Sequence, residues 1–132
     1  MVKRTESKSF EQFEGTVEDI KVESSNLPDD VSEQYHLFIK AHDQEIGGKT
    51  GLIHEWIRIS PTATPSSVPE GCVMDRYLQQ LEILFPEVKD KEFHSEAFLL
   101  LKDKKCLFKK LKLGKSFEEH KAKDYWTPVK VL

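Results

Sequence analysis

Cysteine is scarce in this chain of 132 residues, and long apolar runs are missing. The two cysteines, Cys72 and Cys106, stand far apart and form no C-x-x-C pair, which excludes a disulfide scaffold and indicates free thiols in a reducing, cytoplasmic setting. The longest apolar run is five residues, 97–101, so we expect no segment that spans a bilayer. The first residues contain no apolar stretch of the kind found in secretory signals, and we expect none.

An excess of charge of one sign is also missing from the chain as a whole, whose formal net charge is −3. The balance is uneven along the sequence, however. Residues 101–132 hold ten lysines against four acids, whereas residues 1–100 hold ten basic residues against nineteen acids. A basic last third on an acidic body is able to form a local anion-binding face, although clustering among so many charged residues explains the pattern equally well.

Three strands are expected before the middle of the chain. Residues 13–24 contain a glycine and a slip in apolar register, which is typical of one long strand that bends or bulges. Residues 34–42 alternate apolar and polar side chains. Residues 51–60 are rich in β-branched and aromatic types and predict a third strand.

Helical periodicity follows a loop that contains three prolines. Apolar side chains recur at three- and four-residue spacing from Met74 to Phe85, which predicts an amphipathic helix that ends at Pro86. A second, shorter helix is expected at residues 93–101. The chain therefore changes from strand to helix patterning after its third strand.

Two further strands are expected at residues 105–113 and 125–132, and Pro128 places the last one at a sheet edge or a bulge. The fold class is thus mainly β, with a helical segment between strands three and four. This is the order of the OB-fold, a five-stranded Greek-key barrel. We expect a flexible tail at 1–9 and a single OB-like domain at 10–132. An α+β sandwich with a helical cap fits the same order and stays open.

The layout resembles that of small single-domain OB-fold proteins, of viral and microbial type, that bind single-stranded DNA. The resemblance covers about residues 10–132 and rests on element order and on the placement of aromatic and basic residues. It implies a non-catalytic strand-binding protein, although OB-folds also bind proteins and oligosaccharides. Five segments carry it: GTVEDI at 15–20, HEWIRI at 54–59, YLQQL at 77–81, FKKLKLG at 108–114 and YWTPVKVL at 125–132.

Strand alternation supplies the candidate binding residues. If Tyr35 and its alternate neighbours face the core, Phe38 and Lys40 face outward, and the matching register of the third strand turns Trp56 and Arg58 outward. Rings that stack on bases beside cations that follow phosphates are what single-stranded nucleic acid requires.

The opposite register of the third strand is equally open. The first register buries Glu55, and a lone carboxylate is costly to bury. The second exposes Glu55 and buries Trp56, which suits the usual place of tryptophan in a core.

A basic edge is expected on the fourth strand. Lys109, Lys110 and Lys112 are candidates for phosphate contact, although lysines also protect edge strands from aggregation. Trp126 is a candidate third stacking residue, since either it or its neighbour Tyr125 faces away from the core.

No catalytic or metal-binding pattern emerges. The five histidines lack the spacing of a zinc site, and no nucleophile elbow is present, so we expect no enzyme, no metal and no cofactor. We predict largely sequence-tolerant binding of single-stranded nucleic acid in replication or repair, and we expect ssDNA rather than RNA as the ligand. Protein partners in those processes and a homo-oligomer are left open. The alternative is an OB-fold protein–protein interaction or assembly module that binds no nucleic acid.

Overall fold

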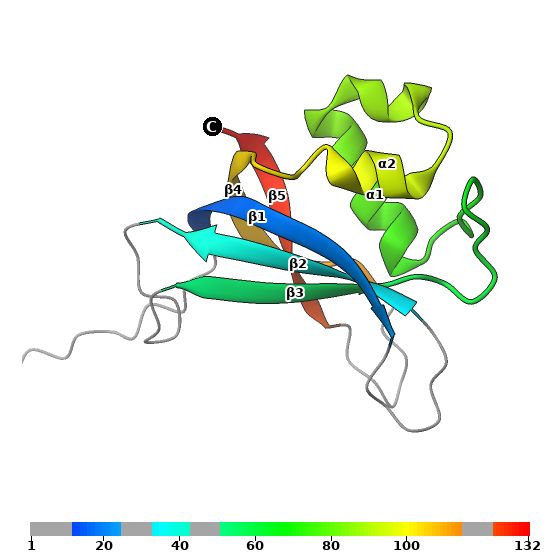
Figure 1. Cartoon of the computed structure of the whole chain (residues 1–132), viewed down its shortest axis with the longest axis horizontal. Helices are drawn as coiled ribbons and strands as arrows, with labels where there is room; N and C mark the ends of the chain where they lie inside the picture. Colours follow the sequence, from blue (N-terminus) through cyan, green and yellow to red (C-terminus); the bar gives the residue numbers. More distant parts are fainter. Residues whose placement is uncertain (1–11, 25–32, 43–50, 115–122) are drawn as a thin grey trace, which may run out of the picture.

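Five strands form one antiparallel sheet in the computed structural model, which describes residues 12–24, 33–42, 51–114 and 123–132 (Figure 1). The expected tail at 1–9 lies outside these residues. All five expected strands are present, within a few residues of their predicted ends. They are β1 (Gln12–Ser24), β2 (Glu33–Ala41), β3 (Leu52–Arg58), β4 (Lys105–Lys112) and β5 (Asp124–Val131).

The strands lie in the order β3-β2-β1-β4-β5, and each neighbouring pair is antiparallel. β3 and β5 are therefore the two edges, and no backbone ladder joins them in the described part of the chain. The mainly β class, with a helical segment between the third and fourth strands, is confirmed. Within the residues that the structure describes, the sheet is not closed by hydrogen bonds into a barrel.

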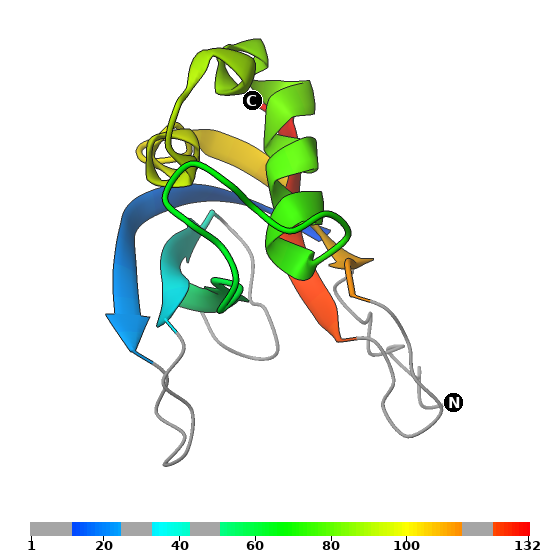
Figure 2. The ribbon, with the colours of Figure 1, turned by 90° about the vertical axis from the view of Figure 1, so that its right-hand side faces the viewer.

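The first strand is long and bent, as its sequence predicts (Figure 2). Its first half pairs with β4 and its second half with β2, and the register shifts between Val17 and Asp19. Gly15 lies where both neighbours meet the strand. A Cβ atom there would stand 2.8 Å from Phe13 Cε2 and 2.9 Å from Ile39 Cγ2, so only glycine fits the crossing without a shift.

Three helical segments connect β3 to β4: α1 (Val73–Leu84), the 3-10 helix η1 (Pro86–Asp90) and α2 (His94–Leu99). The Sγ atom of Cys72 caps α1 by accepting a hydrogen bond from the Asp75 amide at 3.4 Å. Helix α1 ends just before Pro86, where the sequence predicts its end. No helix in the described residues is long and apolar enough to cross a membrane.

Helix α1 packs beside β5, as Figure 2 shows. The Tyr77 hydroxyl donates to the carbonyl of Trp126 at 3.0 Å, and Gln80 Nε2 donates to the carbonyl of Pro128 at 3.1 Å. Pro128 lies at the irregularity between β5 and β4, on an edge strand, which confirms its predicted place. The core fills the space between the helices and the inner face of the sheet; its largest fully buried side chains include Tyr77, Phe13, Phe98, Phe108, Leu37, Ile39 and Ile57.

Candidate nucleic-acid interface

The paired strands β2 and β3 turn alternate side chains away from the core. Tyr35, Leu37 and Ile39 are buried on the inner face, and Ile57 lies beside them on β3. In the observed register His36 stands opposite Trp56, and Phe38 stands opposite His54. Of the two registers that the sequence leaves open, the structure has the one that exposes Trp56 and buries Glu55.

Four rings gather on this outer face, two from each strand, and we call them the ring cluster: His36, Phe38, His54 and Trp56. His36 lies at its centre, with ring centroids 4.0 Å from Phe38, 4.8 Å from Trp56 and 4.9 Å from His54. His36 is buried by these neighbours and Phe38 is half-buried. Trp56, at 38% exposure, and His54 are open to solvent.

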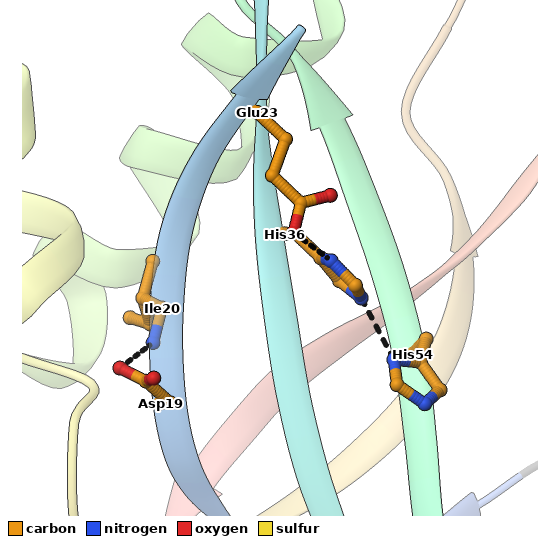
Figure 3. A network of polar contacts seen from close by, with 5 residues as sticks. All are labelled: Asp19, Ile20, Glu23, His36 and His54. Atoms are coloured by element: carbon orange, nitrogen blue, oxygen red, sulfur yellow. Dashed lines mark hydrogen bonds and ion pairs between the residues drawn. The ribbon is translucent and has the colours of Figure 1, made fainter. Parts of the chain in front are cut away.

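A line of hydrogen bonds crosses the ring cluster and begins on β1 (Figure 3). His36 Nδ1 donates to Glu23 Oε1 at 2.8 Å, and His36 Nε2 lies 2.7 Å from His54 Nδ1. The line joins three strands and holds the His36 ring, whose two nitrogens both have a partner, in one orientation at the centre of the cluster.

Cationic side chains border the ring cluster. Lys21 on β1 places its Nζ atom 5.2 Å from the centroid of the Phe38 ring, within cation–π range. Lys40 and Arg58 are exposed at opposite ends of the paired segment of β2 and β3. The outer face therefore combines open rings with cations on both sides, as the alternation predicts for Phe38, Lys40, Trp56 and Arg58.

The lysines of β4 are all exposed, but they do not form one continuous edge. Strand alternation sends Lys109 to the side opposite that of Lys110 and Lys112. The Lys110 ammonium lies 5.1 Å from the centroid of the Trp126 ring. These cations flank the sheet at β4 and β5, whereas the ring cluster lies on β2 and β3 at the other end of the strand order.

Trp126 belongs to the core. Its side chain is only 7% exposed, and its ring meets the Phe13 ring edge-on at 4.7 Å. The Lys110 ammonium lies over part of the remaining exposed surface of the Trp126 ring. No open ring face is available to a base, so the expectation that Trp126 is a third stacking residue is corrected. The reason is that its partner in the dipeptide, Tyr125, takes the more exposed position.

Glu55 is a buried carboxyl group on the inner face of β3, with 5% exposure. Burial raises its pKa to about 7, against the opposing effects of the Lys123 and Lys110 charges and of backbone hydrogen bonds from Trp126 and Trp56. Its Oε1 atom has no hydrogen-bond partner among the described residues. Burying a charged lone carboxylate is costly, and the raised pKa of Glu55 reflects that cost.

His36, His54 and Glu23 are not among the candidate binding residues that the sequence supplies. Alternation alone carries the signal that they share a face. What the sequence lacks is the cross-strand register that brings them into contact. In the described residues no group of three or more His, Cys, Asp or Glu is arranged to hold a metal ion.

No protein-family model, no curated protein and no solved structure matches this chain.

Proposed function

We propose that this protein binds single-stranded nucleic acid, ssDNA in the first place, on the outer face of β2 and β3, without catalysing a reaction on it. The observation that carries the proposal is the ring cluster, which offers the open rings of Trp56 and His54 with Lys21 against Phe38. Bases stack on flat rings in any sequence, and each stacked base contributes about 1–3 kcal/mol.

Cations at the border of the ring cluster suit the backbone of a bound strand. Lys40 and Arg58 lie at opposite ends of the rings, so a strand that crosses the cluster passes both. Each phosphate contact releases condensed counterions, which makes the affinity fall as salt rises. Lys109, Lys110 and Lys112 on β4 stay proposed contacts for a longer strand, apart from the ring cluster.

The strand order supports an OB-type barrel as the finer description of the fold. β3-β2-β1-β4-β5 is a linear order in which joining the two edges, β3 and β5, would close the sheet. Glu55 on β3 reaches the backbone of Trp126 on β5, so the two edges approach each other. In OB-folds the face of strands two and three binds oligonucleotides, which is the face that carries the ring cluster here.

A titration with fluorescent oligo-dT, followed by anisotropy at low and at high salt, tests the proposal. We expect binding at low salt that weakens at high salt. Trp56→Ala is expected to weaken it by about fivefold or more, since one stacking contact is lost. A competition between oligo-dT and oligo-U of equal length then ranks DNA against RNA.

Phe93→Ala is the matched control for Trp56→Ala. Phe93 is 40% exposed, close to the 38% of Trp56, but it precedes α2 in the helical segment. We expect this control to bind the strand as the unchanged protein does. Absence of binding at low salt would refute the proposal, and equal losses in both variants would show that the ring cluster is not the site.

A protein-interaction module is the second candidate, and the helical segment favours it. Residues 70–103 carry eight acids against four lysine or arginine residues. Three large apolar side chains are exposed there: Ile83, Phe93 and Leu99. Acidic surface with exposed apolar anchors suits a basic protein partner. A chain that serves only in this way shows no strand binding in the same titration.

A further inference from the structure

The Glu23–His36–His54 line ends at an atom that faces solvent. Glu23 lies on β1, His36 on β2 and His54 on β3, and the two contacts measure 2.8 and 2.7 Å (Figure 3). A carboxylate only accepts hydrogen bonds, so the Nδ1 atom of His36 holds a proton. The remaining ring nitrogen, Nε2 of the exposed His54, is left outside the line.

Counting protons shows what that nitrogen does. The contact between His36 Nε2 and His54 Nδ1 holds one proton, because two protons would face each other and none would leave two lone pairs together. When both rings are neutral, His36 accepts from His54 Nδ1, and His54 Nε2 has a free lone pair. One added proton, on either ring, leaves His54 Nε2 with a hydrogen. A second added proton would break the contact.

We propose that His36 and His54 together bind one added proton and, through it, a phosphodiester oxygen. Strand binding then takes up a proton at His54 Nε2. The inference rests on the proposed function and adds the ligand group and the linkage. Protonation turns this atom from an acceptor, which repels a phosphate oxygen, into a charge-assisted donor, which binds one. The inner hydrogen bonds are kept, so no rearrangement of the sheet is needed.

The neighbouring charges decide whether His36 or His54 carries the added charge, but in either case His54 Nε2 holds a hydrogen. On β1, Glu23 faces His36 and favours a cation there, while Lys21 lies over Phe38 and opposes it. Asp19 on β1 is engaged elsewhere, with the Ile20 amide at 2.9 Å (Figure 3) and with Lys102 at 4.0 Å. Among the described residues of β2 and β3, the exposed Lys40 and Arg58 also carry charge on this face, and Glu55 of β3 lies on the inner face.

A bound phosphate stabilises the protonated histidine pair electrostatically. Its negative charge beside His54 Nε2 favours the protonated pair, so the bound state holds more protons than the free state. Linkage then requires the affinity for a strand to rise as the pH falls. One linked proton limits that rise to about tenfold per pH unit.

Calorimetry in two buffers of different ionisation enthalpy counts the protons directly. Oligo-dT is titrated into the full chain at about pH 7 and at about pH 9. We expect uptake of a fraction of one proton per strand at the lower pH, where the bound pair holds more of the proton than the free pair, and uptake that falls toward none at the higher pH. His54→Gln is expected to abolish the uptake and to bring the affinity at the lower pH close to that at the higher pH.

His42→Gln is the matched control, because His42 lies just past the end of β2 with its Nε2 atom on the Thr16 hydroxyl at 2.6 Å, and has no contact with the ring cluster. It is expected to keep the uptake. An oligo-dT with uncharged methylphosphonate linkages is expected to bind without proton uptake, since no phosphate charge faces His54. Circular dichroism melting confirms that each variant is folded.

The outcomes separate the two proposals. No strand binding at either pH overturns the proposed function and this inference with it. Binding without proton uptake, or uptake that survives in His54→Gln, overturns this inference and leaves the proposed function standing. Uptake that persists with the uncharged strand also overturns it, because the linked proton would then not face a phosphate.

Discussion

Glu55 on one edge strand has its buried carboxyl group near the Trp126 backbone on the other; burial raises the pKa of the carboxyl, and that backbone lowers it. The strands concerned, β3 and β5, share no backbone ladder in the described residues. A side chain thus spans the place where the sheet is left unclosed. The side chain that does so is a carboxyl group with a pKa of about 7, so this link depends on pH.

Glu55→Gln is expected to remove a pH-dependent loss of stability. The pKa of this carboxyl rises from an ordinary 4.5 to about 7 on folding, so the folded state binds the proton more tightly than the unfolded chain. Its contribution is complete below about pH 4.5 and is lost as the pH rises through 7, by about 3 kcal/mol. The amide of glutamine has no such loss. The free energy of unfolding of the variant, measured with urea, is therefore expected to rise relative to that of the parent protein between about pH 5 and 8.

Glu92→Gln serves as the control, since Glu92 is exposed on the helical segment. Its unfolding free energy is expected to follow that of the unchanged protein over the same pH range. If Glu55→Gln shows the same pH dependence as the unchanged protein, the carboxyl is not held protonated between the edge strands.

Trp126→Phe and Trp56→Ala are expected to have opposite effects. Trp126 is 7% exposed and packs on Phe13, so its truncation to phenylalanine leaves a cavity and lowers the free energy of unfolding by about 2 kcal/mol. Its affinity for oligo-dT is expected to stay unchanged, because the ring faces no ligand. Trp56→Ala is expected to lose affinity with little loss of stability. A folded Trp126→Phe protein with weakened strand binding would restore Trp126 to the interface.

Patterning predicts the elements of this fold well because burial follows local period. Alternation from Tyr35 to Ile39 places one face inward, and helical spacing from Met74 to Leu81 does the same for α1; both sets are buried as expected. A slip in period near Val17 marks the bulge of β1. Each of these signals lies within one segment, so the sequence contains it.

The site needs information that no single segment contains. Which register β3 takes depends on whether burying Glu55 costs more than exposing Trp56, and the inner face reduces the cost of burying Glu55 through the Lys123 charge and the Trp126 backbone. The contact of His36 with His54 depends on cross-strand pairing. The choice between Tyr125 and Trp126 depends on Phe13, which lies more than a hundred residues away in the chain.

Gly15→Ala is expected to destabilise the protein by about 1–3 kcal/mol through overpacking. A Cβ atom at this position would stand 2.8 Å from Phe13 Cε2, 2.9 Å from Ile39 Cγ2 and 3.0 Å from the Lys40 carbonyl oxygen. The backbone oxygen is unable to move aside, so the strand itself must shift. The midpoint of urea unfolding measures the effect. Gly114→Ala is the control, since its nearest neighbour, Val73 Cγ2, lies at 3.4 Å; an equal loss in both variants would contradict the crowding argument.

Lys40→Ala is expected to make strand binding less sensitive to salt. Lys40 is exposed at one end of the ring cluster, and a strand bound as proposed would place a phosphate there. Removing one phosphate contact reduces the slope of log affinity against log salt by about 0.7 for a single strand, and weakens binding for all base sequences alike. Lys89→Ala is the control, because Lys89 is a similarly exposed lysine whose ammonium lies 3.6 Å from Glu82 on the helical segment. Oligo-dT titrations at four or more salt concentrations give both slopes, and equal slopes for the two variants would place the phosphate path away from Lys40.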